Sequence, residues 1–383
     1  MFETLTFLPL ERVHYGPGSV SALPGELDAL DAHRALIISG RTVADETPIV
    51  ANIAGSLGAR RAGLFKGVRQ HVPLSDVTRA AAMARDLRAD LLISVGGGSA
   101  IDAAKAIAWE LAAGDRPPPQ IAIPTTLSAA EFSHIAGFTI EGDGEDDRSK
   151  DRRRHAALTP RAIILDAQLT VHTPAWLWAS SGIRALDHAV ETLYAPGEHP
   201  IQSLLALEAI RELFTCLPGA GADPPPDPSQ EQSWVALPSS HRQVALRQRC
   251  QIAAWMSYFA PAAIKMGLSH VLSKSFGTTY RVPHGVTSCI TLPHVMRHMA
   301  QTHAPALARM ARAIGVAGPQ TPDAGAALAA AGAVSDLIQR LGLPHRLRDV
   351  DVPRDAILPI ARAAAGDDAN KQAIAVHILQ EAW

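Results

Sequence analysis

Short apolar runs alternate with helix-like patterns through the first part of the chain. The runs are rich in Ile, Leu, Val and Ala and lack alternating polar positions, which is typical of strands buried on both faces. Between them, apolar residues recur at helical spacing, as across residues 77–87. This alternation predicts an α/β domain with a doubly wound, mostly parallel sheet. The expected strands cover residues 35–40, 62–65, 91–95, 121–123, 137–140 and 162–165.

Beyond about residue 170 the pattern changes. Long helical patterns rich in Ala and Leu take over, and no convincing strand follows. We therefore expect two domains, an α/β domain over residues 1–170 and an all-helical domain over residues 171–383. The segment 218–240, rich in Pro and Gly, is expected to be a loop because helical patterns continue after it.

The most informative stretch joins an apolar run to a helical pattern through three consecutive glycines, 96–98. Ser99 and Asp102 follow as an S-x-x-D pattern, which predicts a capping box at the start of that helix. Glycines beside exposed helix N–H groups favour a bound phosphate, although a merely tight turn has the same pattern. The stretch is not the G-x-G-x-x-G fingerprint, and no G-K-[ST] follows as in a P-loop.

Composition places the chain among globular proteins and excludes several partners. Of its 383 residues, 47% are hydrophobic and 19% are charged, with a formal net charge of −2. Without a basic surplus we expect no nucleic-acid partner. No apolar run is long enough to span a bilayer and no signal peptide is apparent, so we expect no membrane partner. The three widely spaced cysteines predict no disulfide framework and fit a cytoplasmic location.

Several motifs follow one another along nearly the whole chain. They are Gly96-Gly97-Gly98-Ser99 with Asp102 and Lys105, Pro124-Thr125-Thr126, the segment 182–188, His270, and Pro283-His284-Gly285. In this order they resemble the cofactor loops and second-domain motifs of the iron-containing alcohol dehydrogenase superfamily, which shares the dehydroquinate synthase-like fold. Residues 70–73 and 182–194 look closest to maleylacetate reductases. The resemblance implies an amino-terminal dinucleotide-binding domain, a helical catalytic domain, an NAD(P) cofactor and a homodimer.

The resemblance and the expected strand ends together imply a cofactor site, because ligands of parallel sheets bind at the carboxyl ends of the strands. Asp102 would repel a pyrophosphate, so we expect loop N–H groups to hold it. Lys150 stands in a charged run that otherwise fits a solvated loop. Gly40-Arg41 follows Ser39 with no carboxylate to reject a 2′-phosphate, so we expect NADPH to be accepted alongside NADH. The expected cofactor-binding residues are Ser39, Gly40, Gly96, Gly97, Gly98, Ser99, Asp102, Thr125, Thr126 and Lys150.

The second-domain motifs depart from the metal site of the family. Metal-dependent members hold their ion with one Asp and three His, and the histidines match His188, His270 and His284. Arg184 occupies the Asp position, and Lys274 replaces a further active-site His. Arg keeps its proton and would repel a divalent ion, so we expect no metal. Three imidazoles do bind zinc in other proteins, which keeps a metal-dependent alternative open.

Two cations near the expected metal position suit the reduction of a carbonyl group. Hydride addition places negative charge on the oxygen, which Arg184 and Lys274 would stabilise while a neighbouring His supplies a proton. The same cations suit a small anionic substrate. A plainer interpretation leaves Arg184 paired with Asp187 on a solvated helix face and His270 in the core. The expected catalytic residues are Arg184, His188, His270, Lys274 and His284.

These observations predict an NAD(P)-dependent reductase of a small oxo acid or related carbonyl compound, working without metal. One alternative is an iron- or zinc-dependent alcohol dehydrogenase, which elemental analysis would distinguish. Another is a lyase or cyclase like the dehydroquinate synthases, which would turn over without net change in nicotinamide absorbance. A third is an inactive cofactor-binding protein, because two family site positions are altered.

Overall fold

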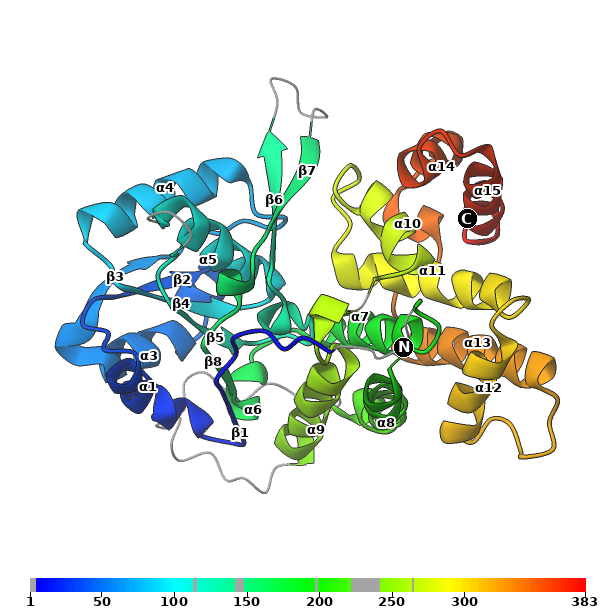
Figure 1. Cartoon of the computed structure of the whole chain (residues 1–383), viewed down its shortest axis with the longest axis horizontal. Coiled ribbons are helices and arrows are strands. Elements are labelled where there is room, and N and C mark those ends of the chain that lie inside the picture. Colours follow the sequence, from blue (N-terminus) through cyan, green and yellow to red (C-terminus); the bar gives the residue numbers. More distant parts are fainter. Residues whose placement is uncertain (1–4, 113–115, 142–147, 197–198, 222–241, 264) are drawn as a thin grey trace. The chain divides into compact units, whose positions relative to one another are not determined.

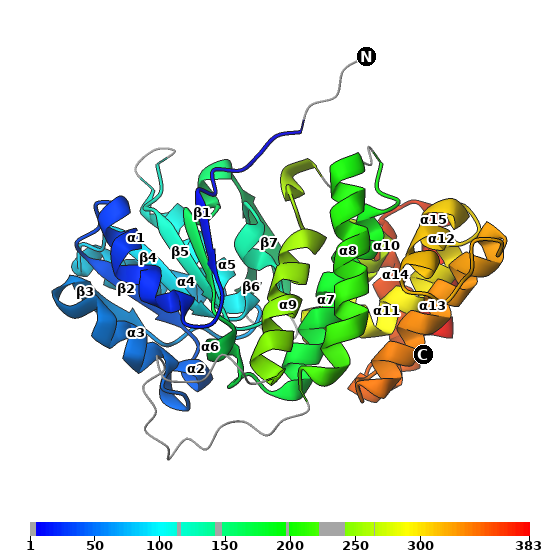
Figure 2. The same ribbon diagram turned by 90° about the horizontal axis from the view of Figure 1, so that it is seen from below.

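The computed structural model of the chain describes residues 5–112, 116–141, 148–196, 199–221, 242–263 and 265–383. Contacts divide the chain into two compact units (Figures 1 and 2). The first comprises Met1–Pro174 with Asp223–Gln251, and the second comprises Ala175–Ala222 with Ile252–Trp383. Each unit is therefore formed by two separate stretches of the chain, and one boundary between the units falls within helix α9 (Arg242–Ser257).

The first unit is built on a six-stranded sheet in which every neighbouring pair of strands is parallel. The strand order β1-β8-β5-β4-β2-β3 confirms the predicted parallel α/β sheet. The short apolar runs form β2, β4, β5 and β8, which are buried at every position because both faces are covered. The strands are β1 (Arg12–Tyr15), β2 (Ala35–Ser39), β3 (Arg61–Phe65), β4 (Leu91–Gly96), β5 (Gln120–Pro124) and β8 (Ala162–Leu165).

Helices cover both faces of this sheet, and alternate side chains of a strand enter different cores (Figure 1). Ala35 and Ile37 of β2 pack in one core with α1 and α3, whereas Leu36 and Ile38 pack in the other with α4 and α5. The helices of this unit are α1 (Leu23–Ala29), α2 (Arg41–Asp45), α3 (Ile49–Leu57), α4 (Leu74–Asp86), α5 (Gly98–Leu111) and α6 (Ala167–Thr170).

One local expectation in this unit is wrong. The charged run around Lys150 fits a solvated loop by its sequence, but Arg148–Arg154 forms strand β7, antiparallel to β6 (Ile135–Glu141). Ala136 and Phe138 of β6 are buried against the α4 and α5 side of the core, which fixes β6 and leaves its edge to pair with β7.

The second unit is helical throughout its described residues, as predicted. One core joins α10, α11, α14 and α15 through buried side chains such as Phe276, Ile290 and Ile360. No helix in the described part of the chain is long and apolar enough to cross a membrane. The helices are α7 (Ala175–Thr192), α8 (Pro200–Cys216), the end of α9, α10 (Leu268–Gly277), α11 (His284–Met299), α12 (Ala304–Ala313), α13 (Asp323–Arg340), α14 (Ile357–Ala365) and α15 (Ala369–Glu381).

Candidate active site

In the first unit, the three glycines lie where β4 turns into α5. Gly96 has φ +141°, a conformation that residues with a side chain rarely adopt. The predicted capping box of Ser99 and Asp102 is wrong, because α5 begins at Gly98 and its N-cap is Gly97, without a side-chain cap. No side chain therefore caps the start of α5, although the N–H groups of Ala100 and Ile101 already donate to the Gly97 carbonyl.

The loop after β5 lies directly against these glycines. The backbone N–H of Thr125 donates to the carbonyl of Gly96 at 2.9 Å. A Cβ on Gly97 would come within 3.1 Å of the Thr126 methyl carbon Cγ2. The hydroxyl of Thr126 is buried and has no hydrogen-bond partner among the described residues. The structure thus brings Gly96 and Gly97 together with Thr125 and Thr126. The hydroxyl of Thr126 is the polar group that these two loops leave without a hydrogen bond.

Two of the other expected cofactor residues are already engaged within the protein. Ser39 ends β2 beside Val95, and its hydroxyl donates to the Val95 carbonyl at 2.8 Å. Asp102, which was expected to accept from loop N–H groups, has its Oδ1 3.4 Å from Lys105 Nζ. Lys150 lies opposite Thr139 in the β6–β7 ribbon, and its side chain is outside the part that the structure describes. The cofactor role of these residues stays a prediction.

Lys105, Asp102 and Glu131 form a cluster of charged side chains next to the glycine loop. Lys105 is fully buried and donates to the carbonyls of Ala130 (2.5 Å) and Ile135 (3.1 Å). Burial lowers the pKa of Lys105, and burial raises the pKa of the neighbouring Glu131 to about 7. Lys105 thus ties the start of α5 to the segment that follows the Thr125-Thr126 loop.

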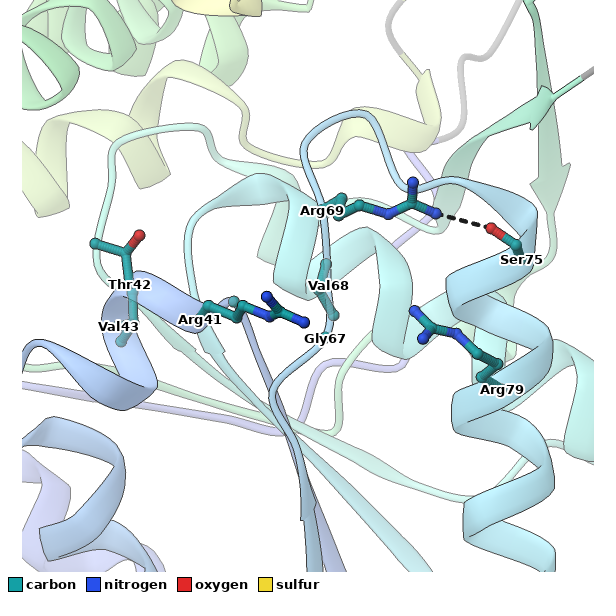
Figure 3. A pocket seen from close by; sticks show the side chains of 9 residues that line it. Arg41, Thr42, Val43, Gly67, Val68, Arg69, Ser75 and Arg79 are labelled. Carbon is teal, nitrogen blue, oxygen red and sulfur yellow. Dashed lines mark hydrogen bonds between the residues drawn. The ribbon is translucent and has the colours of Figure 1, made fainter.

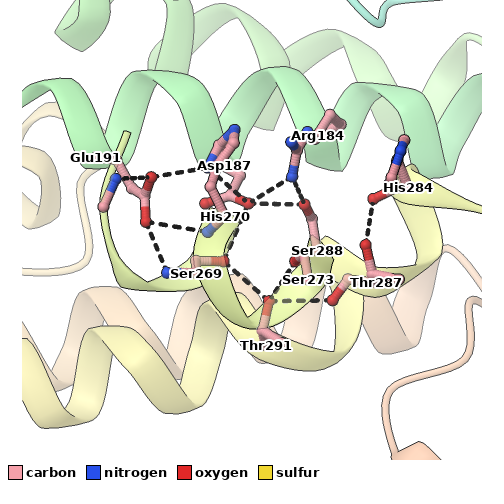
Figure 4. A network of polar contacts seen from close by, with 12 residues as sticks. Arg184, Asp187, Glu191, Ser269, His270, Ser273, His284, Thr287, Ser288 and Thr291 are labelled. Atoms are coloured by element: carbon pink, nitrogen blue, oxygen red, sulfur yellow. Dashed lines mark hydrogen bonds and ion pairs between the residues drawn. The ribbon is translucent and has the colours of Figure 1, made fainter. Parts of the chain in front are cut away.

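In the second unit, the expected catalytic residues gather around α7 (Figure 4). Arg184 is only 9% exposed, so the solvated helix face considered from the sequence is wrong. Its Nη1 donates to the Ser288 hydroxyl at 3.0 Å and lies 3.5 Å from Asp187 Oδ2. Burial lowers the pKa of Arg184, but a guanidinium keeps its proton at any neutral pH.

Asp187 connects the groups of this network. Its Oδ2 accepts from Ser288 Oγ (2.7 Å) and Ser269 Oγ (3.0 Å) and lies 3.6 Å from His270 Nδ1. Its Oδ1 is buried without a hydrogen bond among the described residues. Burial raises the pKa of Asp187. Sequence reasoning considered Asp187 only as a surface partner of Arg184 and missed its central place.

Glu191 was also missed, and it holds the start of α10. Its carboxylate accepts from the backbone N–H groups of Gly267 (2.6 Å) and Ser269 (2.8 Å). A Cβ on Gly267 would lie 3.0 Å from Glu191 Oε1, so the close approach depends on glycine. Glu191 Oε2 lies 2.7 Å from His270 Nδ1, and burial raises the pKa of Glu191 to about 7. The spacing 184, 187, 188, 191 on one helical stripe was the signal that could have revealed both acids.

His188 and His270 stack with ring centroids 4.9 Å apart, and Tyr258 stacks on His188 at 4.5 Å. Burial lowers the pKa of both histidines well below the usual value, and the charges of Arg184 and Lys274 act in the same direction. Both imidazoles are therefore neutral near pH 7. If one of these two neutral rings supplies the proton to the substrate, as expected from the sequence, a neighbouring acid must replace it.

The remaining predicted residues lie on the neighbouring helices. His284 is the first residue of α11, after Pro283, and lies beyond Arg184 along the network in Figure 4. A Cβ on Gly285 would lie 2.6 Å from the Ser180 backbone, so α11 begins in close contact with α7. Lys274 lies in the last turn of α10.

One group among the described residues has the side chains of a metal site. Asp187, Glu191 and His270 are all buried, and their potential ligand atoms lie within 4.8 Å of one another. The described residues include no comparable grouping of His188, His270 and His284. Asp187 and Glu191, the acids beside His270, thus lie at other positions than the family's Asp ligand, whose place Arg184 takes.

Comparisons with known proteins cover both units. The family described as iron-containing alcohol dehydrogenase matches residues 10–167, and its C-terminal family matches residues 178–381. Maleylacetate reductase of Burkholderia cepacia is 31% identical over 91% of this chain and 87% of its own length. Maleylacetate reductase 2 of Cupriavidus pinatubonensis is 37% identical over 83% and 79%. The crystal structure of maleylacetate reductase from Agrobacterium tumefaciens matches with a TM-score of 0.81 and 27% identity, over 100% of this chain and 99% of the other. This chain, a dehydrogenase or reductase similar to maleylacetate reductases, therefore belongs to the iron-containing alcohol dehydrogenase family.

Proposed function

We propose that this protein is an NAD(P)H-dependent reductase of a small anionic oxo acid of the maleylacetate type, and that it works without a metal ion. The observation that carries the proposal is Arg184, a permanent cation buried inside α7 among polar groups. Burying a charge is costly unless it is paired, and a site built around one suits an anionic substrate. The relatives named maleylacetate reductases support this substrate class.

The glycine loop supports the nicotinamide cofactor. The Gly96 conformation, the missing Cβ at Gly97 and the unsatisfied Thr126 hydroxyl provide a cradle of backbone N–H groups for a pyrophosphate. When bound, the reduced nicotinamide would supply a hydride to an electrophilic carbon of the oxo acid, and negative charge would develop on the oxo oxygen. The protein must then stabilise the oxygen that becomes negative.

Arg184 and Lys274 are the groups suited to that task. A guanidinium N–H in a buried site stabilises developing negative charge more strongly than it would in water. Asp187 orients Arg184 from one side and Ser288 from another, so the cation needs little reorganisation. Lys274 contributes a second positive charge whose effect reaches His188 and His270.

Glu191 is the group best suited to supply the proton. With a pKa of about 7, a substantial fraction of Glu191 is protonated at neutral pH. Its Oε2 lies 2.7 Å from His270 Nδ1, close enough to pass the proton to that nitrogen once the two groups align, while the ring releases the one on Nε2. His270 Nε2 is buried and makes no hydrogen bond to the described residues, so it can serve a substrate oxygen. The reaction leaves the reduced substrate, the oxidised nicotinamide and an ionised Glu191, which takes up a proton from water.

The family's metal does not fit its usual positions here. Arg184 replaces a carboxylate ligand, and its charge would repel a divalent cation. In the Asp187, Glu191 and His270 group, both Glu191 oxygens already accept backbone N–H groups and Asp187 Oδ2 accepts two hydroxyls. Arg184 lies 3.5 Å from Asp187, and its charge also acts on Glu191, so a cation already stands beside these acids. No step is therefore assigned to a metal.

Two measurements test this function. Chelator-treated protein should reduce maleylacetate with NADPH or NADH, followed by the loss of nicotinamide absorbance. Protein purified without chelator should contain far less than one metal per chain by elemental analysis. A metal-dependent alcohol dehydrogenase, the candidate favoured by the Asp187, Glu191 and His270 group, would show stoichiometric metal and lose activity on chelation. Turnover without a net change in absorbance would instead indicate lyase chemistry.

A further inference from the structure

A three-arginine cavity of about 660 Å³ lies in the first unit, at the carboxyl ends of β2 and β3 (Figure 3). Arg41, Arg69 and Arg79 line it, and Figure 3 shows Arg41 and Arg79 reaching toward the same space from opposite sides. Gly40, one of the expected cofactor residues, also lines it, so the cavity belongs with the cofactor site considered above. The second unit contains a different feature, a tyrosine that the proposed mechanism does not use.

Tyr258 completes a stack of three rings in the second unit, directly after helix α9. The ring centroids of Tyr258 and His188 are 4.5 Å apart, with 20° between the ring planes. The corresponding values for His188 and His270 are 4.9 Å and 29°. Two rings cannot cover the same face of one imidazole, so Tyr258 and His270 lie on opposite faces of His188. The His188 ring is therefore held between the two others.

This arrangement restricts a side chain that would otherwise turn easily. The torsion about the Cβ–Cγ bond of a histidine is broad and only weakly restricted by itself. With both faces covered, the His188 ring cannot rotate without displacing a neighbouring ring, and stacked rings attract each other. His188 and His270 are 5% and 2% exposed, whereas Tyr258 is half-buried, so Tyr258 is the member of the stack that meets solvent.

The stack leaves the edge of the His188 ring as the part that can meet a ligand. Its Nδ1 is buried and makes no hydrogen bond to the described residues, which is unusual because buried polar atoms are normally paired. Arg184 lies one helical turn before His188 on the same stripe of α7, and its charge acts on the His188 ring. With its proton on Nδ1, the imidazole is a hydrogen-bond donor next to the cation that would attract an oxo acid.

We propose that Tyr258 is a positioning residue of the reaction, whose ring fixes the His188 imidazole so that its Nδ1 hydrogen-bonds the oxo acid beside Arg184. The ring and not the hydroxyl has this role, because the two side chains meet face to face. The proposal rests on the proposed reductase function and adds a residue that acts through His188. Such positioning matters because a small misplacement of a catalytic group can cost about a hundredfold in rate.

Two variants separate the ring of Tyr258 from its hydroxyl. Tyr258→Leu removes the ring and should lower the turnover number for maleylacetate reduction about tenfold or more, while changing the dissociation constant of NADPH less than about twofold. Tyr258→Phe keeps the ring and should restore the turnover number to within about twofold of wild type. Circular dichroism checks the fold of both variants. The matched control is Trp109→Leu, because Trp109 packs on His155 in the first unit, outside this site, and should keep the wild-type turnover number.

A double-mutant cycle shows whether Tyr258 acts through His188. In a His188→Asn protein, which has no ring to position, Tyr258→Leu should cause no further loss, measured by single-turnover oxidation of NADPH with the enzyme in excess. The inference is overturned if Tyr258→Leu keeps the wild-type turnover number, if Tyr258→Phe is as slow as Tyr258→Leu, or if the two losses in the cycle add as free energies. Failure of the proposed function would instead appear in the wild-type protein, which would then not reduce maleylacetate at all.

Discussion

At the scale of single residues, the main feature of this protein is the buried pair of Arg184 and Asp187. Removing one member of a buried ion pair is strongly destabilising, because the other charge is left without compensation. Ser288 and Ser269 add hydrogen bonds to Asp187, and Ser288 also accepts from Arg184. The pair therefore has a structural role as well as the proposed catalytic one, and tests must separate the two.

Arg184→Ala should reduce the turnover number by about a hundredfold or more, the scale expected for losing one donor to an oxyanion. Added zinc or ferrous ion should not rescue it, because no carboxylate has been restored. Steady-state kinetics of oxo acid reduction measures the effect, and circular dichroism checks the fold. Arg211→Ala, an arginine on α8 paired with Glu208 on its own helix, is the matched control and should keep full activity.

Arg184→Asp is the sharper variant, because it rebuilds the Asp and three-His set of the metal-dependent relatives. It should gain affinity for zinc or iron, measured by elemental analysis after dialysis. Lys274 on α10 should limit the gain by charge repulsion. Wild-type protein that holds stoichiometric metal and loses activity on chelation would contradict the account of this site.

Glu191 predicts the pH dependence of the reaction. If its protonated form supplies the proton, the turnover number for reduction should be constant at low pH and fall about tenfold per pH unit above pH about 7. Glu191→Gln keeps an oxygen for the α10 N–H groups but carries no titrating proton. Its pH profile should be flat at a low rate. An unchanged inflection in this variant would assign the titration to another group.

The raised pKa of Glu131 predicts how the free energy of unfolding depends on pH. Its pKa is about 7 in the folded protein, above the ordinary 4.5 of a free side chain. Protonation thus adds stability that is complete below pH 4.5 and is lost as the pH rises through about 7. Relative to wild type, Glu131→Gln should gain up to about 3 kcal/mol of unfolding free energy between pH 5 and pH 8. For the surface variant Glu46→Gln, the difference in unfolding free energy from wild type should be the same at pH 5 and pH 8. A difference for Glu131→Gln that also stays the same over this range would refute the prediction.

At the scale of elements, strand β4 and helix α5 set the geometry of the cofactor loop. The parallel strands β4 and β5 end side by side, with Gly96 opposite Pro124, so the glycines and Thr125-Thr126 must meet. A helix that starts at Gly98 immediately after a buried strand directs its free N–H groups to the sheet edge. The absence of a side-chain cap is therefore consistent with a ligand at this helix end.

Gly97→Val should abolish nicotinamide binding and leave the helical unit folded. The Cβ alone would lie 3.1 Å from Thr126 Cγ2, and the branched methyl groups must take space that the pyrophosphate needs. Fluorescence titration with NADPH and NADH measures the loss. Gly55→Ala in α3 is the matched control, because a Cβ there meets nothing within 4 Å. An unchanged cofactor affinity in Gly97→Val would contradict the assignment of this loop as the site of the cofactor pyrophosphate.

At the scale of the whole molecule, the sheet of the first unit ends in an edge strand. Strand β1 pairs with β8 on one side and lies at the end of the strand order. Tyr15 in this strand is 63% exposed, and Phe7 before it is 65% exposed. An exposed edge with large apolar side chains favours pairing with another chain.

We propose that the protein is a homodimer that uses this edge. Light scattering should give a mass about twice the 40.6 kDa of a single chain. Tyr15→Lys should shift the protein toward the single-chain mass, since charged residues on an edge strand oppose pairing. Leu328→Lys, an exposed apolar residue on α13, is the matched control and should leave the mass unchanged. A single-chain mass for wild type at micromolar concentration would contradict the proposal.

Local patterns in the sequence determined the architecture of both units. Strands covered on both faces are mostly apolar, so the runs that form β2, β4, β5 and β8 could be located without knowledge of their partners. The predicted run at residues 137–140 lies instead in β6, which pairs with β7 outside the parallel sheet. The glycine loop was recognisable because only glycine suits the conformation of Gly96. The family resemblance likewise identified Arg184, His188 and His270, which the structure brings together on α7 and α10.

What only the tertiary structure decided depends on contacts between residues far apart in sequence. A helical pattern shows which residues share a stripe, but not that the stripe of Arg184 is buried or that Asp187 meets Ser269 and Ser288. Nor could it show that Glu191 holds the start of α10, 76 residues away. The three-arginine cavity likewise arises because the ends of β2 and β3 and the helix α4 converge in space. Burial and charge pairing, which set the protonation of these groups, are properties of that convergence and leave no local signal.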